Sequence, residues 1–478
     1  MLAWPGWVGA PSGTPANPSG SVTTYRVLLS HPLEPRLLML QTHGEWRLPH
    51  WDDSNAHDWQ ATEHVNRAVA ARFGAETTVL RCARDHVDPV TGAHERVYEL
   101  ENHSAAHDMP LAATWISMSD LPQLRIESTE LRELVHDWFA RSTRALPGRG
   151  AAWTQPGWYV QALAWAAAQL REQGLTVERT PEQLRAWERA FVMRLRSDGG
   201  SFLFRAVPPV FRHAPALAQW LHAQFPQSMP ELIAADVQRG WYLQRELEGV
   251  IMPLEEAREE TLWEDAARRL AEIQVATIAR TEELAGLGVP MRTLDVLAYR
   301  LTKVLHDAPA MLLGHGCGLT RPQIERVALY ESRLLECCDE LAGLPIPHAL
   351  EHGDLLAKNV LVTLEGPLFQ DWAAASISHP FFSLFHLLAD ATSLVAETSL
   401  ESRRRLRDVY LEPWREFASR AELVRAFDLA RILAPVHLAA IAHAEIIPAT
   451  GWRWEVECVV PENLRTALEQ LEETEVEA

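Results

Sequence analysis

Three oxygen-bearing side chains stand close together in the segment HGDLLAKNVLVTLEGPLFQDW, residues 352–372. Asp354 follows a His-Gly pair, Asn359 comes five residues later, and Asp371 follows an apolar run. A positioned carboxylate can orient an attacking hydroxyl and accept its proton, and carboxylate and amide oxygens are ligands that Mg²⁺ prefers. Phosphoryl transfer from ATP needs both functions, so this segment is a candidate catalytic site.

The residues between Asn359 and Asp371 indicate the element that positions them. NVLVT and LFQ have the character of strands, and LEGP between them is a turn. The hairpin would bring Asp371 back alongside the loop that contains Asp354. Lys358 would then lie beside the metal site, either reaching a phosphate or remaining a solvated loop lysine. The alternative for the whole segment is that its Asp and Asn residues only form turns.

HGDLLAKN resembles the HGDxxxxN signature of the aminoglycoside phosphotransferase family, and QDWAAASISHPFFSL resembles that family's metal-binding Asp-Trp segment with its following His-Pro. The resemblance covers about residues 150–460. It implies a two-lobed, protein-kinase-like fold, the cofactors ATP and Mg²⁺, and a small-molecule hydroxyl as acceptor. Asp354 would be the catalytic base, with Asn359 and Asp371 as magnesium ligands. His352 would fix the shape of the loop.

The small lobe departs from the family's pattern. The family places a strand lysine on the ATP phosphates and pairs it with a helix glutamate, whereas FLFRAVPP offers Arg205 and the following helix offers Ala214. A planar guanidinium is bulkier than an ammonium and prefers bidentate partners. Arg205 would still hold ATP in a slow or unusual kinase. The alternative is a pseudoenzyme that binds nucleotide or a small ligand and acts as a regulatory or docking protein.

Two further segments of the small lobe are candidates for nucleotide binding. AFVMRLRSDGGSFLFRAVPP predicts a hairpin, whose turn at residues 198–200 either approaches phosphates through backbone donors or is an ordinary type I′ turn. GWYLQREL predicts a strand that resembles the linker between the lobes, where the adenine edge is received. Gln244, Arg245 and Glu246 are therefore expected near the nucleotide.

The first part of the chain predicts a separate α+β domain. Short strands surround the amphipathic helix DWQATEHVNRAVAARFG, which ends at Gly74. The order of WRLP, helix and strands resembles the Nudix hydrolase fold, an α/β/α arrangement, over about residues 21–126. The family's metal-binding glutamates would be replaced by Ala68, Ala71 and Arg72, which cannot neutralise Mg²⁺. We expect a non-catalytic domain that serves a protein partner; a working Nudix hydrolase is a weaker alternative.

These patterns predict an α+β chain made of five parts. They are a flexible leader (1–20), the Nudix-like domain (21–126), a helical connector (127–180), a kinase-like small lobe (181–248) and a helical large lobe with the catalytic loop (249–478).

Composition excludes several classes of partner. The formal net charge of −20 over 478 residues argues against nucleic-acid binding, which depends on clustered Lys and Arg. No apolar run reaches the roughly 20 residues of a spanning helix, so no membrane partner is expected.

The five cysteines lack C-x-x-C spacing, which predicts neither a disulfide framework nor a zinc site and favours a reduced, cytoplasmic setting.

Overall fold

The computed structural model forms two compact units. It describes residues 22–477 except 43, 56, 89, 105–112, 143–149, 248–249, 252–258 and 395–399. Of the described residues, the N-terminal unit contains those of 22–208 with 450–452, and the C-terminal unit those of 209–449 and 453–477. The chain is a mixture of helices and strands, as predicted for an α+β protein.

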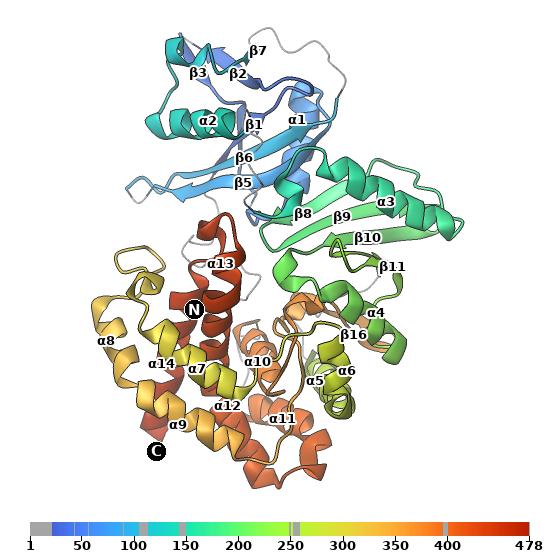
Figure 1. Cartoon of the computed structure of the whole chain (residues 1–478), viewed down its shortest axis with the longest axis vertical. Coiled ribbons are helices and arrows are strands. Elements are labelled where there is room, and N and C mark those ends of the chain that lie inside the picture. The colour runs from blue at the N-terminus through green and yellow to red at the C-terminus, as the bar shows by residue number, and fades with distance from the viewer. Residues whose placement is uncertain are drawn as a thin grey trace. The chain divides into compact units, whose positions relative to one another are not determined.

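The N-terminal unit is built on two small sheets. The four-stranded sheet has the order β4-β1-β6-β5, with β1 parallel to β6, and the three-stranded sheet has the order β3-β2-β7. Two longer helices accompany them (Figure 1). The bounds are β1 Thr23–Leu29, β2 Leu37–Thr42, β3 Glu45–Arg47, β4 His50–Asp53, α1 Glu63–Phe73, β5 Thr77–Val87, β6 His94–Asn102, β7 Ala113–Ile116 and α2 Thr129–Ser142.

The alternation of side chains along β1 explains how these helices pack. Leu28 belongs to the core cluster that contains the apolar face of α2. Tyr25, three residues earlier and therefore on the other face of the strand, contacts His64 of α1 edge to face. The sheet thus lies between the two helices, in the predicted α/β/α order. Helix α1 ends at Gly74 with φ 65°, as the sequence predicted. The relation to Nudix hydrolases stays a prediction.

Three antiparallel strands complete this unit: β8 Glu182–Trp187, β9 Ala190–Ser197 and β10 Gly200–Ala206. Ser197 pairs with Gly200, which confirms the hairpin expected around Asp198. The side chain of Gln183 on β8 donates to Val79 O and accepts from Val79 N, at 2.7 Å each. Trp158, the first residue of the connector helix α3 (Trp158–Glu172), packs its ring against β9. The unit therefore joins the first domain, the connector and β8–β10.

The C-terminal unit is mainly helical, with α7, α9, α12 and α14 packed near one another (Figure 1). The hairpin β15–β16 and the pair β14–β17 lie within it. The bounds are α4 Ala214–Gln224, β11 Leu232–Asp236, β12 Trp241–Arg245, β13 Val250–Ile251, α5 Glu259–Thr277, α6 Thr281–Gly286, α7 Leu294–Leu305, α8 Arg321–Leu329, α9 Glu331–Ala342, β14 Ala349–Glu351, β15 Val360–Thr363, β16 Gly366–Phe369, β17 Ser376–Ser378, α10 Phe382–Leu394, α11 Leu400–Leu411, α12 Arg420–Ile441, α13 Ile447–Ala449 and α14 Val459–Glu477.

Helix α12, with 22 residues, is the longest helix of this unit among the described residues, and most of it is buried. It begins at a capping box, in which Ser419 Oγ accepts a hydrogen bond from Glu422 N. It then continues through a π-helical turn, Ala442–Ile446. The stretch Arg420–Ala449 is long and apolar enough to cross a membrane, but 72% of its most apolar window is buried inside the protein. Its apolar character is accounted for by its place in the core.

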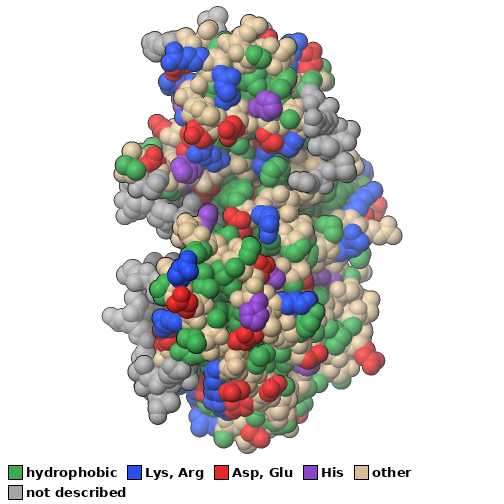
Figure 2. Space-filling view, turned by 60° about the vertical axis from the view of Figure 1, so that its left-hand side comes forward, with side chains coloured by type: hydrophobic (Ala, Val, Ile, Leu, Met, Phe, Trp, Pro, Cys, Tyr) green, Lys and Arg blue, Asp and Glu red, His purple; other side chains and the backbone are tan. Residues whose placement is uncertain are grey.

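The surface mixes charges of both signs. On the face in Figure 2, Lys and Arg side chains are interspersed with Asp and Glu side chains. Exposed ion pairs such as Arg425 with Glu340, at 2.5 Å, are examples. On that face the acidic excess of the chain does not collect into a single patch.

The prediction that the cysteines form no disulfide is wrong for one pair. Cys317 and Cys458 are bonded, with Sγ atoms 1.98 Å apart and Cα atoms 5.7 Å apart. Cys82, Cys337 and Cys338 are buried and form no disulfide bond. The two bonded residues are 141 positions apart, so only the fold brings them together and their spacing gave no signal.

Candidate active site

The loop after β14 contains Asp354, whose side chain is 2% exposed. Gly353 before it has φ +77°, in the left-handed region that favours glycine. A Cβ added there would lie 2.4 Å from Ala374 O. The loop therefore passes directly against the backbone that follows Asp371, and the glycine of the His-Gly-Asp motif is required by both conformation and space.

His352 ties this loop to the second strand of the hairpin. Its Nδ1 accepts a hydrogen bond from Asp354 N at 3.3 Å, so Nε2 carries the proton and donates to Gln370 O at 3.2 Å. The ring packs on Trp372 with centroids 4.3 Å apart. Burial lowers the pKa of His352 to about 4, so the ring is neutral at pH 7. These are the contacts of a residue that holds the loop.

Asn359 contacts Asp354 directly. Its Nδ2 donates to Asp354 O at 2.8 Å and to Asp354 Oδ2 at 3.2 Å. The predicted hairpin is present, with Val360 of β15 opposite Phe369 of β16. Gln370 N donates to Asn359 O at 3.0 Å, and Asp371 is the next residue. Asp371 therefore directly follows the residue whose backbone is hydrogen-bonded to Asn359.

Asp371 has an uncommon backbone conformation, φ 64° and ψ 54°. It is one of two non-glycine residues with positive φ in the described part of the chain. Aspartate tolerates this region better than most residues, and such strained positions gather at functional sites. The conformation turns the chain sharply between β16 and the buried Trp372.

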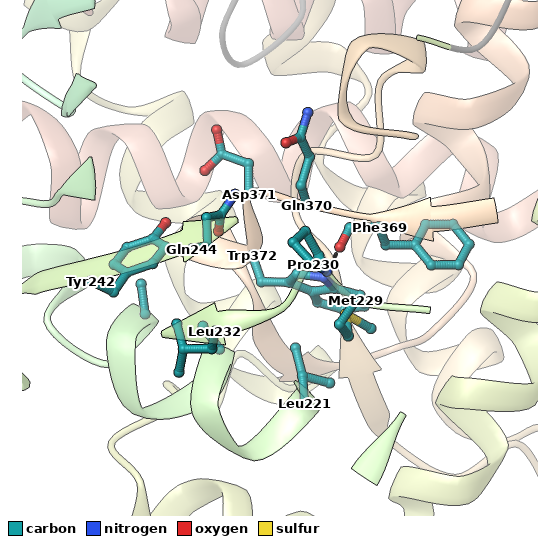
Figure 3. Close-up of a pocket in the computed structure, with 12 residues that line it drawn as sticks. Leu221, Met229, Pro230, Leu232, Tyr242, Gln244, Phe369, Gln370, Asp371 and Trp372 are labelled. Atoms are coloured by element: carbon teal, nitrogen blue, oxygen red, sulfur yellow. Dashed lines mark hydrogen bonds between the residues drawn. The ribbon is translucent and has the colours of Figure 1, made fainter. Parts of the chain in front are cut away.

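A small pocket that is partly open to solvent borders Asp371. Figure 3 shows the side chains of Asp371 and Gln370 pointing to one side, away from Leu221 and Leu232 at the apolar end. The lining residues come from α4, the segment 229–232, β12 and the segment 369–372, which all belong to the C-terminal unit. An apolar pocket edged by a few polar groups is the usual form of a small-molecule site.

The residues predicted to bind nucleotide fall in different places. Gln244 is buried and lines the pocket. Arg245 Nε pairs with Glu231 Oε2 at 2.5 Å, and Glu246, just after β12, is half-buried. Lys358 is half-buried in the same turn as Asn359.

Arg205 is half-buried on β10, opposite Val192, in the N-terminal unit. Ala214 is the first residue of α4 and lines the pocket; the sequence of this helix contains no acidic residue. The contribution of Arg205 to nucleotide binding stays a prediction.

Glu351 is a site residue that the sequence analysis missed. Its carboxylate is 1% exposed and accepts hydrogen bonds from Gly353 N at 2.7 Å and Ser376 Oγ at 3.1 Å. Burial raises the pKa of Glu351 to about 7. It holds the Gly353 turn from within. A glutamate directly before His-Gly-Asp, at the end of an apolar strand, was the available signal.

A buried arginine links the π-helical turn to the same region. Arg292, 2% exposed, donates from Nη1 to Ala374 O at 2.9 Å and from Nη2 to Glu445 Oε2 at 2.7 Å. Arg300 pairs with the other oxygen of Glu445. Burial would raise the pKa of Glu445, but the two arginines lower it below its ordinary value. Arg292 therefore connects Glu445, in the π-helical turn after α12, to the backbone of Ala374, three residues after Asp371.

Residues 187–423 match the model of a phosphotransferase enzyme family, APH. Asp354, Asn359 and the β15–β16 hairpin all fall within the matched range. This part of the chain belongs to that family, which confirms the resemblance carried by the HGDLLAKN and QDW segments.

Several solved structures are similar to the chain at low identity. A macrolide 2′-phosphotransferase type I is 15% identical, with 65% of this chain and 96% of that chain covered and a TM-score of 0.45. A choline/ethanolamine kinase family protein from Mesorhizobium loti is 17% identical, with 65% and 99% covered and a TM-score of 0.42. A choline kinase from Streptococcus pneumoniae is 11% identical, with 66% and 99% covered and a TM-score of 0.45. These values carry no argument about the acceptor. No curated protein sequence matches the chain.

Proposed function

We propose that this protein transfers the terminal phosphoryl group of ATP to a hydroxyl of a small molecule. Asp354 acts as the base, and Mg²⁺ is held by Asn359 and Asp371. The observation that carries the proposal is the hydrogen-bonded Asp354–Asn359 pair, set beside Asp371 by the β15–β16 hairpin. It lies in the part of the chain that belongs to a family of phosphotransferase enzymes.

The donor set fits magnesium. Mg²⁺ takes oxygen ligands and binds through one or two protein groups together with substrate phosphates. Asn359 contacts Asp354 through its amide nitrogen, so the amide oxygen is the atom that would serve the metal. Asp371 supplies a carboxylate that is half-exposed at the pocket edge. When bound, the ion would neutralise charge on the phosphates.

The residues of the chain supply positioning and proton transfer. Asn359 holds one carboxylate oxygen of Asp354, Oδ2, which restricts rotation of the carboxylate. The carboxylate would orient the acceptor hydroxyl and take its proton as the phosphoryl group is transferred. Lys358 and Arg205 would supply positive charge to the phosphates, with Gln244 to Glu246 near the nucleotide.

The absence of an acidic residue from α4 favours a second candidate function. Arg205 stands where the family has its strand lysine and α4 supplies no acid, so the phosphates would be held differently, because a planar guanidinium prefers bidentate partners. The domain would then bind Mg-ATP or a small ligand without efficient transfer and act as a regulatory protein. In either case we propose a cytoplasmic protein whose Nudix-like domain, about residues 21–126, serves as a non-catalytic docking domain.

The test is ATP consumption by the full-length protein with a panel of hydroxylated metabolites and antibiotics. The Asp354→Asn variant should lose about 10²–10⁴-fold in turnover. The exposed Asp339→Asn on α9 is the matched control and should keep full activity.

Calorimetry with Mg-ATP separates the two functions. Binding without turnover on any acceptor supports the regulatory protein. Turnover that is equal in the wild type and Asp354→Asn contradicts the proposed base, and absence of Mg-ATP binding contradicts both functions.

A further inference from the structure

Two potential metal ligands on the loop before α8, His315 and Cys317, meet a third, Cys458, at the start of α14. The ligand atoms of His315, Cys317 and Cys458 all lie within 4.8 Å of one another. His315 Nδ1 is 3.1 Å from Cys317 Sγ. Within the described residues, no other group of three His, Cys, Asp or Glu side chains is as closely gathered. The cluster contains none of the residues assigned to phosphoryl transfer.

The loop that carries His315 and Cys317 is tightly constrained. Leu312 is the second non-glycine residue with positive φ in the described part of the chain, at 50°. A Cβ added at Gly318 would lie 1.9 Å from Leu312 O, so the two ends of the loop are in contact. Arg465 Nη2 donates to Cys317 O at 3.0 Å and to Gly318 O at 2.9 Å. A strained backbone persists only where its surroundings determine it, and it gathers at functional sites.

Positive charge lies close to both cysteines. Cys458 directly precedes α14, a helix of 19 residues whose N-terminus carries partial positive charge. The guanidinium of Arg465 lies against the backbone of Cys317. Both sulfurs are buried, whereas His315 is exposed and gives the cluster an access route from solvent.

We propose that Cys317, Cys458 and His315 form a redox-gated site for a zinc-class divalent ion. A cellular thiol or dithiol reductant donates two electrons to the bridge, breaks the S–S bond and is itself oxidised to a disulfide. Each cysteine gains one proton, and binding of the ion displaces both protons to solvent. The site thus exists only in the reduced protein. Two thiolates and an imidazole select zinc over magnesium, and water completes a tetrahedron on the exposed side.

The backbone is compatible with both states. The Cα atoms of the two cysteines are 5.7 Å apart. Sulfurs bound to one zinc at about 2.3 Å lie about 3.8 Å from each other in a tetrahedral site. Side-chain rotation supplies that separation without movement of the loop or of α14. The site goes beyond the proposed phosphotransfer and does not depend on it.

Cobalt(II) titration of the full-length protein tests the proposal, because Co²⁺ replaces Zn²⁺ and gives a thiolate-to-metal absorption. Protein reduced with dithiothreitol and desalted without oxygen should bind one equivalent with this absorption, and zinc should displace it. Oxidised protein should show none. His315→Ala should weaken binding at least about 10-fold, and Cys317→Ser should remove most of the thiolate absorption. The Cys337→Ser/Cys338→Ser variant, which lacks two unrelated buried thiols, should behave as the wild type.

Several results would overturn the proposal. One is the absence of cobalt–thiolate absorption from the wild-type protein after treatment with dithiothreitol. This includes the case in which the disulfide resists reduction and serves only to stabilise the fold. Another is unchanged affinity in His315→Ala. His315→Ala changes an exposed side chain and keeps both cysteines. It therefore tests the metal site even if a cysteine variant misfolds.

Discussion

Replacing Gly353 by alanine perturbs the catalytic loop in a way that the structure allows to be calculated. An alanine at φ +77° costs about 1–2 kcal/mol of stability, because left-handed backbone crowds Cβ. The new Cβ would also lie 2.4 Å from Ala374 O, a backbone atom that cannot rotate away. Relief of such overpacking costs about 1–3 kcal/mol. The sum predicts a loss of roughly 2–5 kcal/mol for the C-terminal unit.

The same clash should reduce activity, because either Gly353, which directly precedes Asp354, or Ala374, three residues after Asp371, must move. A displacement near 1 Å costs about 10²-fold in rate. Gly288→Ala is the matched control. It has φ +87° in the same unit, and its added Cβ would have its nearest neighbour, His213 Cβ, at an ordinary 3.7 Å. Urea unfolding and turnover should both separate the two variants. If Gly353→Ala is no less stable and no less active than Gly288→Ala, the reasoning about the loop is refuted.

Two more predictions concern buried charges around the site. Because burial raises the pKa of Glu351 from 4.5 to about 7, its protonated form is favoured by folding, so its contribution to stability is complete below pH 4.5 and is lost as pH rises to 7. Relative to Glu351→Gln, the wild type should therefore lose up to about 3 kcal/mol over that range; parallel melting curves against pH would contradict this. Arg292→Ala removes the donor to Ala374 O and leaves Arg300 as the remaining partner of Glu445, so it should cost about 1–3 kcal/mol. A double-mutant cycle with Glu445→Gln should show a coupling free energy of about 0.5–3 kcal/mol. Additive changes in the free energy of unfolding would argue against a stabilising Arg292–Glu445 interaction.

Local patterns in the sequence were enough to predict several elements, including the hairpin nearest to the proposed site. Alternating apolar residues and an intervening Asp-Gly-Gly gave the β9–β10 hairpin, and a glycine marked the end of α1. The hairpin between Asn359 and Asp371 followed from two short strands around a turn. In each case the deciding interactions lie within a few residues along the chain, so the sequence contains the signal.

Interactions between distant residues gave no such signal. The Arg292–Glu445 pair is separated by 153 positions, and the Cys317–Cys458 bridge by 141. The anchoring of β8 to β5 through Gln183 and Val79 likewise depends on packing of separate segments. No periodicity or motif predicts these contacts, because each partner alone is an ordinary arginine, cysteine or glutamine. Glu351 is intermediate: its place before the motif was visible, but its burial was not.

The central claim is that Asp354, Asn359 and Asp371 form one phosphotransfer site. The most direct measurement is a crystal structure of the full chain with Mg²⁺ and a non-hydrolysable ATP analogue. We expect Asn359 Oδ1 and an Asp371 carboxylate oxygen at about 2.1 Å from the metal, with Asp354 facing the terminal phosphate. A nucleotide bound with its metal elsewhere, or with Asp371 turned away from it, would contradict the account.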